Sequence, residues 1–140
     1  MKNAIILILV LVCVGGVLYV AKGWTVRRID PKIAKFNQDA ETLILGIQQY
    51  KEFVGNYPEG NNISIAKALL GQTEKKVLIL AVRRSDLNDK GEILDPWGTP
   101  VQFYFSHNEV MIRSAGPNKI WEDSAMPTAD DLYRTAPKLK

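Results

Sequence analysis

The sequence predicts an α+β fold in which a long helix packs on a small antiparallel sheet. Two observations carry this prediction. Residues 31–54 contain an apolar stripe of helical spacing, and residues 101–106 and 109–114 alternate between apolar and polar side chains. Spacings of three and four residues place side chains on one helix face, whereas alternation is typical of a half-buried strand. The chain has 140 residues, which suffices for one domain.

The first element is an uncharged apolar segment, residues 4–21. As a helix it would rise roughly 27 Å, close to the ~30 Å hydrocarbon core of a bilayer. Basic residues follow it, with Asp30 as the one acid among them: Lys22, Arg27, Arg28, Lys32 and Lys35. We therefore expect residues 1–30 to be a retained membrane anchor with a basic juxtamembrane segment that binds lipid phosphate rather than nucleic acid. A cleaved signal peptide is the alternative.

A long helix is predicted from residue 31 to residue 54. Asp30 and Pro31 are typical of the N-cap and the first helical position, and Gly55 is typical of the residue after a helix end. The apolar stripe comprises Ile33, Phe36, Ala40, Leu43, Ile47, Tyr50 and Val54. Such a stripe covers the sheet of its own domain or packs against another subunit, and the first interpretation is the commoner one.

The middle of the chain carries weaker signals. Residues 55–62 form a loop by composition, and a short helix is predicted from Ile63 to Leu70, ending at Gly71. Residues 77–82, VLILAV, favour a strand, although a helix also fits an apolar run of that length.

The segment LDPWGTP, residues 94–100, places Trp97 inside a turn. Pro96 and Pro100 restrict the backbone on either side, and Gly98 permits a positive φ angle. Because a large aromatic side chain favours burial, we expect Trp97 to fix this turn to the core.

A β-hairpin is predicted directly after the turn. Residues 101–106 and 109–114 would be its strands, and His107 and Asn108 its two-residue connection. Residues 116–140 have no long periodic run and are predicted to be a long loop.

The residue inventory argues against an enzyme. His107 is the only histidine, and Cys13, the only cysteine, lies in the apolar segment. No histidine-based triad or zinc cluster follows from this inventory. The net charge is +3, and its basic excess is concentrated beside the predicted anchor, so a nucleic-acid partner is not expected.

Three stretches together resemble a known family: IQQYKEFVGNYPEG at the helix end, LDPWGTPVQFYF, and IRSAGPNKIWEDSAMPTADDL after the hairpin. In order and spacing, over roughly residues 40–133, they are similar to the type G major pseudopilins of type II secretion systems. The resemblance implies a pilin-like fold, with a long N-terminal helix on a small antiparallel sheet and a C-terminal loop. It also implies a single-pass inner-membrane protein with residues 31–140 in the periplasm, whose partners are other pseudopilin-like subunits and inner-membrane secretion components.

In this family the C-terminal loop can hold calcium. By position, the resemblance implies ligands at Asn118, Asp123, Asp130 and Asp131. Calcium takes about six to eight oxygen ligands, which carboxylates and free carbonyl groups supply. Asn118 brings no charge, and Lys119 stands where the family has glycine. Because of these two changes, we expect a solvated acidic loop that binds calcium weakly or not at all, and calcium binding is the alternative.

The N-terminal segment departs from the family pattern. Family precursors have a basic leader ending in glycine, followed by a mature chain with glutamate at its fifth position. Here the first acid is Asp30, and Gly15 and Gly16 follow a run of apolar residues. We therefore expect no cleavage by prepilin peptidase. This departure supports a second hypothesis, a stand-alone single-pass envelope domain that uses the pseudopilin scaffold outside any filament.

The charges around the apolar segment bear on its orientation. Five basic residues follow it and only Lys2 precedes it, so the positive-inside rule alone would place the following domain in the cytoplasm. The periplasmic location that we expect rests on the resemblance instead.

Overall fold

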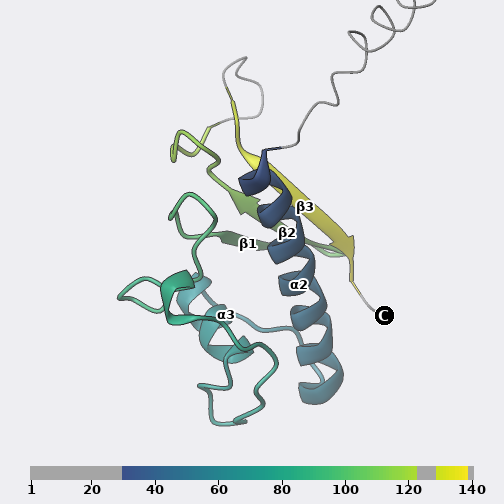
Figure 1. Cartoon of the computed structure of the whole chain (residues 1–140). Coiled ribbons are helices and arrows are strands. Elements are labelled where there is room, and N and C mark those ends of the chain that lie inside the picture. Colours follow the sequence, from purple (N-terminus) through teal and green to yellow (C-terminus); the bar gives the residue numbers. More distant parts are fainter. Residues whose placement is uncertain (1–29, 123–128, 139–140) are drawn as a thin grey trace, which may run out of the picture.

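The computed structural model describes residues 30–122 and 129–138. Its elements are helix α2 (Pro31–Val54), helix α3 (Asn62–Leu69), the 3-10 helix η1 (Arg84–Asp86) and the strands β1 (Gln102–Phe105), β2 (Glu109–Ser114) and β3 (Leu132–Pro137). The strands form one antiparallel sheet in the order β1-β2-β3. Helix α2 packs against β2 and β3, and α3 contacts α2 and β1 (Figure 1). The predicted α+β class is therefore confirmed.

Helix α2 has the predicted bounds. The Asp30 carboxylate caps its start by accepting a hydrogen bond from the Lys32 N–H at 2.8 Å. At its end, Gly55 adopts φ 92° and donates its N–H to the Lys51 carbonyl at 2.7 Å. The centre of the predicted apolar stripe is buried against the sheet: Phe36, Ala40, Leu43, Ile47 and Tyr50. The interpretation of the stripe as the core face of its own domain is thus confirmed.

Helix α3 is confirmed, with its start and its end each one residue earlier than predicted. The strand or helix expected over residues 77–82 is wrong. That segment makes one isolated bridge, between Leu70 and Leu78, and has no further regular structure. Its apolar residues act singly: Ile79 and Leu80 pack against the core, whereas Leu78 is 65% exposed. Without a neighbouring strand to pair with, an apolar run of this length stays irregular.

The hairpin is confirmed in register. Phe105 pairs with Val110, and the Ser106 N–H donates to the Glu109 carbonyl at 2.9 Å, which leaves His107 and Asn108 as the connection. Val110 is fully buried and faces the core, as the alternation predicted.

The prediction of an unbroken loop over residues 116–140 is wrong, because Leu132–Pro137 form β3 and pair with β2 along its whole length. The sequence pattern did not predict this strand, because it is an edge strand without a fully buried residue. Only Leu132 and Ala136 pack against the core, and Arg134 separates them on the same face. A period-two pattern interrupted at its middle position gives no alternation signal.

No helix within residues 30–122 and 129–138 is long and apolar enough to cross a membrane. The predicted anchor at residues 4–21 lies outside this described part of the chain.

Candidate metal centre

The turn at residues 94–100 is organised by one buried carboxylate. Asp95 is 6% exposed, and its Oδ1 accepts hydrogen bonds from the Trp97 N–H at 2.9 Å and the Thr99 N–H at 2.8 Å. The main chain closes the same turn, since the Asp95 N–H donates to the Thr99 carbonyl at 2.8 Å. Trp97 is 9% exposed and belongs to the core, so its predicted burial is confirmed.

Ser114, at the end of β2, connects this turn to the loop that follows the sheet. Its hydroxyl is fully buried and donates to Asp95 Oδ2 at 2.6 Å. Ser114 Oγ in turn accepts a hydrogen bond from the Gly116 N–H at 3.0 Å. The pair of Asp95 and Ser114 was not predicted from the sequence. An aspartate just before Pro-Trp-Gly was the available signal, because such a side chain caps the backbone amides of its own turn.

Gly116 brings the two ends of the C-terminal loop together. It adopts φ 67°, and a Cβ atom added there would lie 2.3 Å from the carbonyl oxygen of Asp130. Both the positive φ and this close approach require glycine. The backbone contact places Asp130 and Asp131, which precede β3, against the residues that follow β2.

Three carboxylates gather at this contact. Glu122, Asp130 and Asp131 each offer one oxygen, and these oxygens lie within 4.8 Å of one another. Because a calcium–oxygen bond measures about 2.4 Å, oxygens within this limit are close enough to bind one ion. The Asp130 N–H donates to Glu122 Oε2 at 3.1 Å. This hydrogen bond is a second contact between the two ends of the loop, besides that at Gly116.

The cluster contains carboxylate oxygens that the described residues leave unsatisfied. The Asp131 side chain is 1% exposed, and its Oδ1 has no hydrogen-bond partner among them. The buried Oδ1 of Asp130 has none either. Buried polar atoms are nearly always paired, so these two unpaired anionic oxygens leave acceptors that a cation could bind. Burial of Asp131 also shows that this part of the loop is not simply solvated.

Arg113 of β2 compensates part of this negative charge. Its Nε donates to Asp131 Oδ2 at 2.6 Å, and its Nη2 donates to the Glu122 carbonyl. The guanidinium lies 5.2 Å from the Trp121 ring centroid and 5.4 Å from that of Tyr133. Burial lowers the pKa of Arg113, but hydrogen bonds and the Asp131 charge outweigh this and raise it above its usual value.

The charges of the cluster indicate which charge a bound cation would need. Glu122, Asp130 and Asp131 carry three negative charges and Arg113 one positive charge, so two negative charges remain. A single divalent cation would neutralise them. An all-oxygen donor set suits a hard cation such as calcium better than a transition metal.

The predicted ligands meet different outcomes. Asp130 and Asp131 are in the cluster, and Asp123 lies outside the described residues. Asn118 lies beside the cluster as a hydrogen-bonding residue: its Nδ2 donates to Glu122 Oε2 at 3.0 Å, and its Oδ1 accepts the Ile120 N–H at 2.7 Å. Glu122 was missed as a ligand, because it precedes Asp130 by eight residues and only the close approach at Gly116 makes them neighbours.

Comparisons of this chain with protein-family models, with curated proteins and with solved structures found no match.

Proposed function

We propose that this chain is a membrane-anchored, pseudopilin-like structural subunit that serves type II protein secretion. Residues 1–30 would form the inner-membrane anchor, and residues 31–140 would lie in the periplasm. The observation that supports this most is the conjunction of a long helix, a hairpin launched by the Asp-Pro-Trp-Gly turn, and an acidic cluster that closes the C-terminal loop. These are the parts that the resembling sequence motifs imply, in the same order along the chain.

In this proposal, Glu122, Asp130 and Asp131 would hold calcium through their carboxylate oxygens, and the ion would supply positive charge at the base of β3. The chain's own residues do the rest. Arg113 holds Asp131 against β2, and the Asp130 amide holds Glu122, so the ligands are positioned before the ion arrives. The loop would then present one defined surface to neighbouring subunits, a structural role and not a catalytic one.

The function is tested by deleting the gene from its own host. We expect folded secreted proteins to accumulate in the periplasm and to return to the medium when the full-length chain is supplied again. Normal secretion in the deletion strain would reject the proposal. A reporter that is active only outside the cytoplasm, fused after Lys140, tests the location independently. Activity from a cytoplasm-only reporter would place residues 31–140 on the other side of the membrane.

A stand-alone single-pass envelope domain is the second candidate. It is favoured by the composition of the apolar segment, because residues 4–21 contain no glutamate and the first acid in the sequence is Asp30. Neighbouring genes for a secretion ATPase and an outer-membrane secretin would favour the pseudopilin subunit, and their absence would favour the stand-alone domain.

A further inference from the structure

Helix α2 carries a large apolar side chain that its own domain does not cover. Phe53, near the C-terminal end of the helix, is 73% exposed. The adjacent Glu52 is also exposed and forms no ion pair with any residue from 30 to 122 or from 129 to 138. The outer side of α2 therefore offers a phenyl ring with a carboxylate beside it.

The other half of the same helix forms one wall of a pocket. Its cavity has a volume of about 210 Å³ and opens between α2 and two loops, residues 80–86 and 93–96. Its apolar floor includes Phe36, Leu43 and Ile93. Small-molecule sites typically measure about 300–1,000 Å³. A cavity of about 150 Å³ already holds a benzene molecule, so this pocket suits one aromatic side chain.

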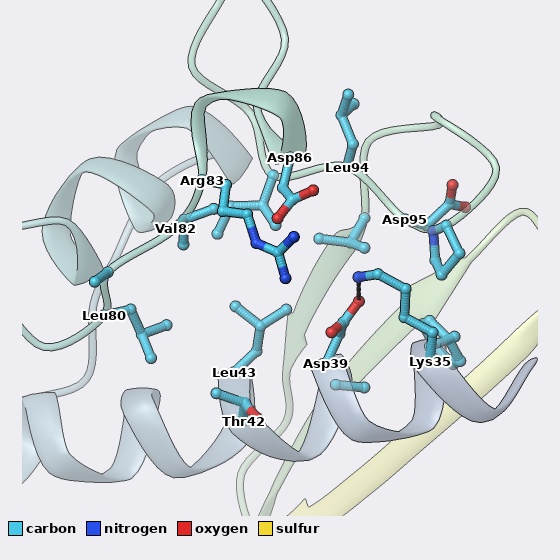
Figure 2. A pocket seen from close by; sticks show the side chains of 16 residues that line it. Lys35, Asp39, Thr42, Leu43, Leu80, Val82, Arg83, Asp86, Leu94 and Asp95 are labelled. Carbon is cyan, nitrogen blue, oxygen red and sulfur yellow. Dashed lines mark hydrogen bonds and ion pairs between the residues drawn. The ribbon is translucent and has the colours of Figure 1, made fainter. Parts of the chain in front are cut away.

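One cation at the rim of the pocket is available for a partner. Lys35 is paired with Asp39 at 2.5 Å, whereas the Arg83 guanidinium has no hydrogen bond or ion pair within the described part of the chain. Figure 2 shows the Arg83 guanidinium projecting toward Leu43 of α2, over the apolar floor. Asp86, also at the rim, accepts the Ser85 hydroxyl at 3.3 Å.

We propose that Phe53 of one copy of this chain inserts into the pocket of the next copy, with Glu52 of the first opposite Arg83 of the second. The two features match in shape, since an exposed ring meets a ring-sized cavity. They also match in charge, because each side holds one unpaired group of opposite sign. This inference rests on the proposed function as an assembling subunit and names the contact through which its periplasmic domains would join.

The positions along α2 decide what kind of assembly results. Phe53 follows Lys35 by eighteen residues, about five helical turns, so both lie on one side of the helix. The ring lies roughly 15–27 Å along the helix from the pocket residues Leu43 to Lys35. Chains anchored in one membrane would have parallel helices, so each contact offsets the next copy along the axis. Such a head-to-tail contact does not close and propagates into a filament.

Chemical cross-linking of the full-length chain in membranes tests the contact. All variants carry Cys13→Ala. Gln49→Cys places one thiol a helical turn from Phe53, and Ala81→Cys places the other at the pocket rim. Phe53 and Arg83 are left unchanged. A short bismaleimide reagent should then produce a ladder of dimers, trimers and larger species. Lys67→Cys, an exposed position on α3, replaces Gln49→Cys in the control pair. A ladder that does not exceed this control would reject the contact.

Further substitutions in this background test the two parts of the contact separately. Phe53→Ala should reduce the ladder about tenfold or more, the loss typical of truncating a buried aromatic anchor. Leu45→Ala, at the other exposed large apolar residue of α2, should leave it unchanged. Glu52→Lys and Arg83→Glu should each weaken it, and their combination in one chain should restore it. Equal losses in the single and combined variants would contradict the pairing of Glu52 with Arg83.

Two outcomes separate this contact from the function on which it rests. A product that stops at dimers would indicate reciprocal two-fold pairing of antiparallel helices and would reject the propagating contact. Cross-linking through the native Cys13, in a chain without added cysteines, reports association of the apolar segments alone. Oligomers through Cys13 without a ladder from Gln49→Cys and Ala81→Cys would reject this contact and leave the proposed function standing. The absence of both would count against the two together.

Discussion

The turn at residues 94–100 and the acidic loop after β2 meet at Ser114, yet they handle buried carboxylates in opposite ways. In the turn, both oxygens of Asp95 accept hydrogen bonds from the chain itself. In the loop, one oxygen of Asp130 and one of Asp131 are buried without a partner among the described residues. The turn is thus complete within the chain, whereas the loop retains acceptors for a cation.

This difference shows that the two regions of the domain are stabilised by different interactions. Asp95 is a single charge surrounded by amide and hydroxyl donors, and these hydrogen bonds offset the free-energy cost of burying its carboxylate. The loop gathers three carboxylates, of which Asp131 alone is paired with the Arg113 guanidinium, so repulsion remains unless positive charge is added. We therefore expect the turn to set the stability of the core and the loop to set its dependence on calcium. The following measurements use residues 30–140 expressed without the apolar segment.

The largest expected effect is at the turn. Trp97→Ala should lower the free energy of unfolding by about 3–5 kcal/mol, the usual cost of removing a buried large aromatic side chain. Urea denaturation with calcium and with chelator should show the same loss, because the side chain belongs to the core. A loss below measurement error would mean that the turn is not attached to the core through this ring.

Arg113→Gln should give the next largest effect and should depend on calcium. Removing one partner of a buried ion pair costs about 3–5 kcal/mol, and we expect the lower end because Arg113 is 19% exposed. In chelator the loss should be full, since Asp131 then lacks any compensating charge. Saturating calcium should recover part of it. Equal losses under both conditions would show that no cation shares the site with the guanidinium.

Calcium itself should stabilise the unmodified domain. A ligand that binds only the folded state adds about 2.7 kcal/mol at a hundred times its dissociation constant. Thermal melting with calcium, compared with chelator, should therefore show a higher Tm, and Asp130→Asn should abolish the difference. Glu74→Gln, an exposed carboxylate far along the chain, serves as the matched control. An unchanged Tm in calcium would identify the loop as one closed by Arg113 alone.

Ser114→Ala should have the smallest effect and should connect the two regions. It leaves Asp95 Oδ2 and the Gly116 N–H without their shared partner, at a cost of about 1–3 kcal/mol. Because Gly116 positions Asp130, the same change should also weaken calcium binding. Calorimetric titration would measure this. An unaltered affinity would show that the turn and the loop are independent.

Much of the fold could be predicted from local pattern. The bounds of α2 followed from a capping aspartate, a proline and a terminal glycine around an apolar stripe, all of which act within a few residues. The hairpin followed from alternation around His107 and Asn108, and burial of Trp97 followed from its size. Two acids that the resemblance implied as ligands, Asp130 and Asp131, lie in the carboxylate cluster.

Other features depended on which segments meet in space. The sequence of residues 77–82 favours a strand, but no strand lies where it could pair. Residues 132–137 lack strand alternation, but the free edge of β2 gives their amides partners. Hydrogen bonding between segments is a property of the assembled sheet, so neither local preference could decide the outcome.

In the candidate site, too, some features follow from the local sequence and others from the tertiary structure. The sequence by itself determined that acids are abundant after the hairpin and that Gly116 accepts a positive φ. Only the tertiary structure selected Glu122 as the third carboxylate, assigned Asn118 to hydrogen bonding and placed Arg113 beside Asp131. The physical reason is distance: charge and coordination act over a few ångströms in space, and chain closure at Gly116 decides which residues come that near.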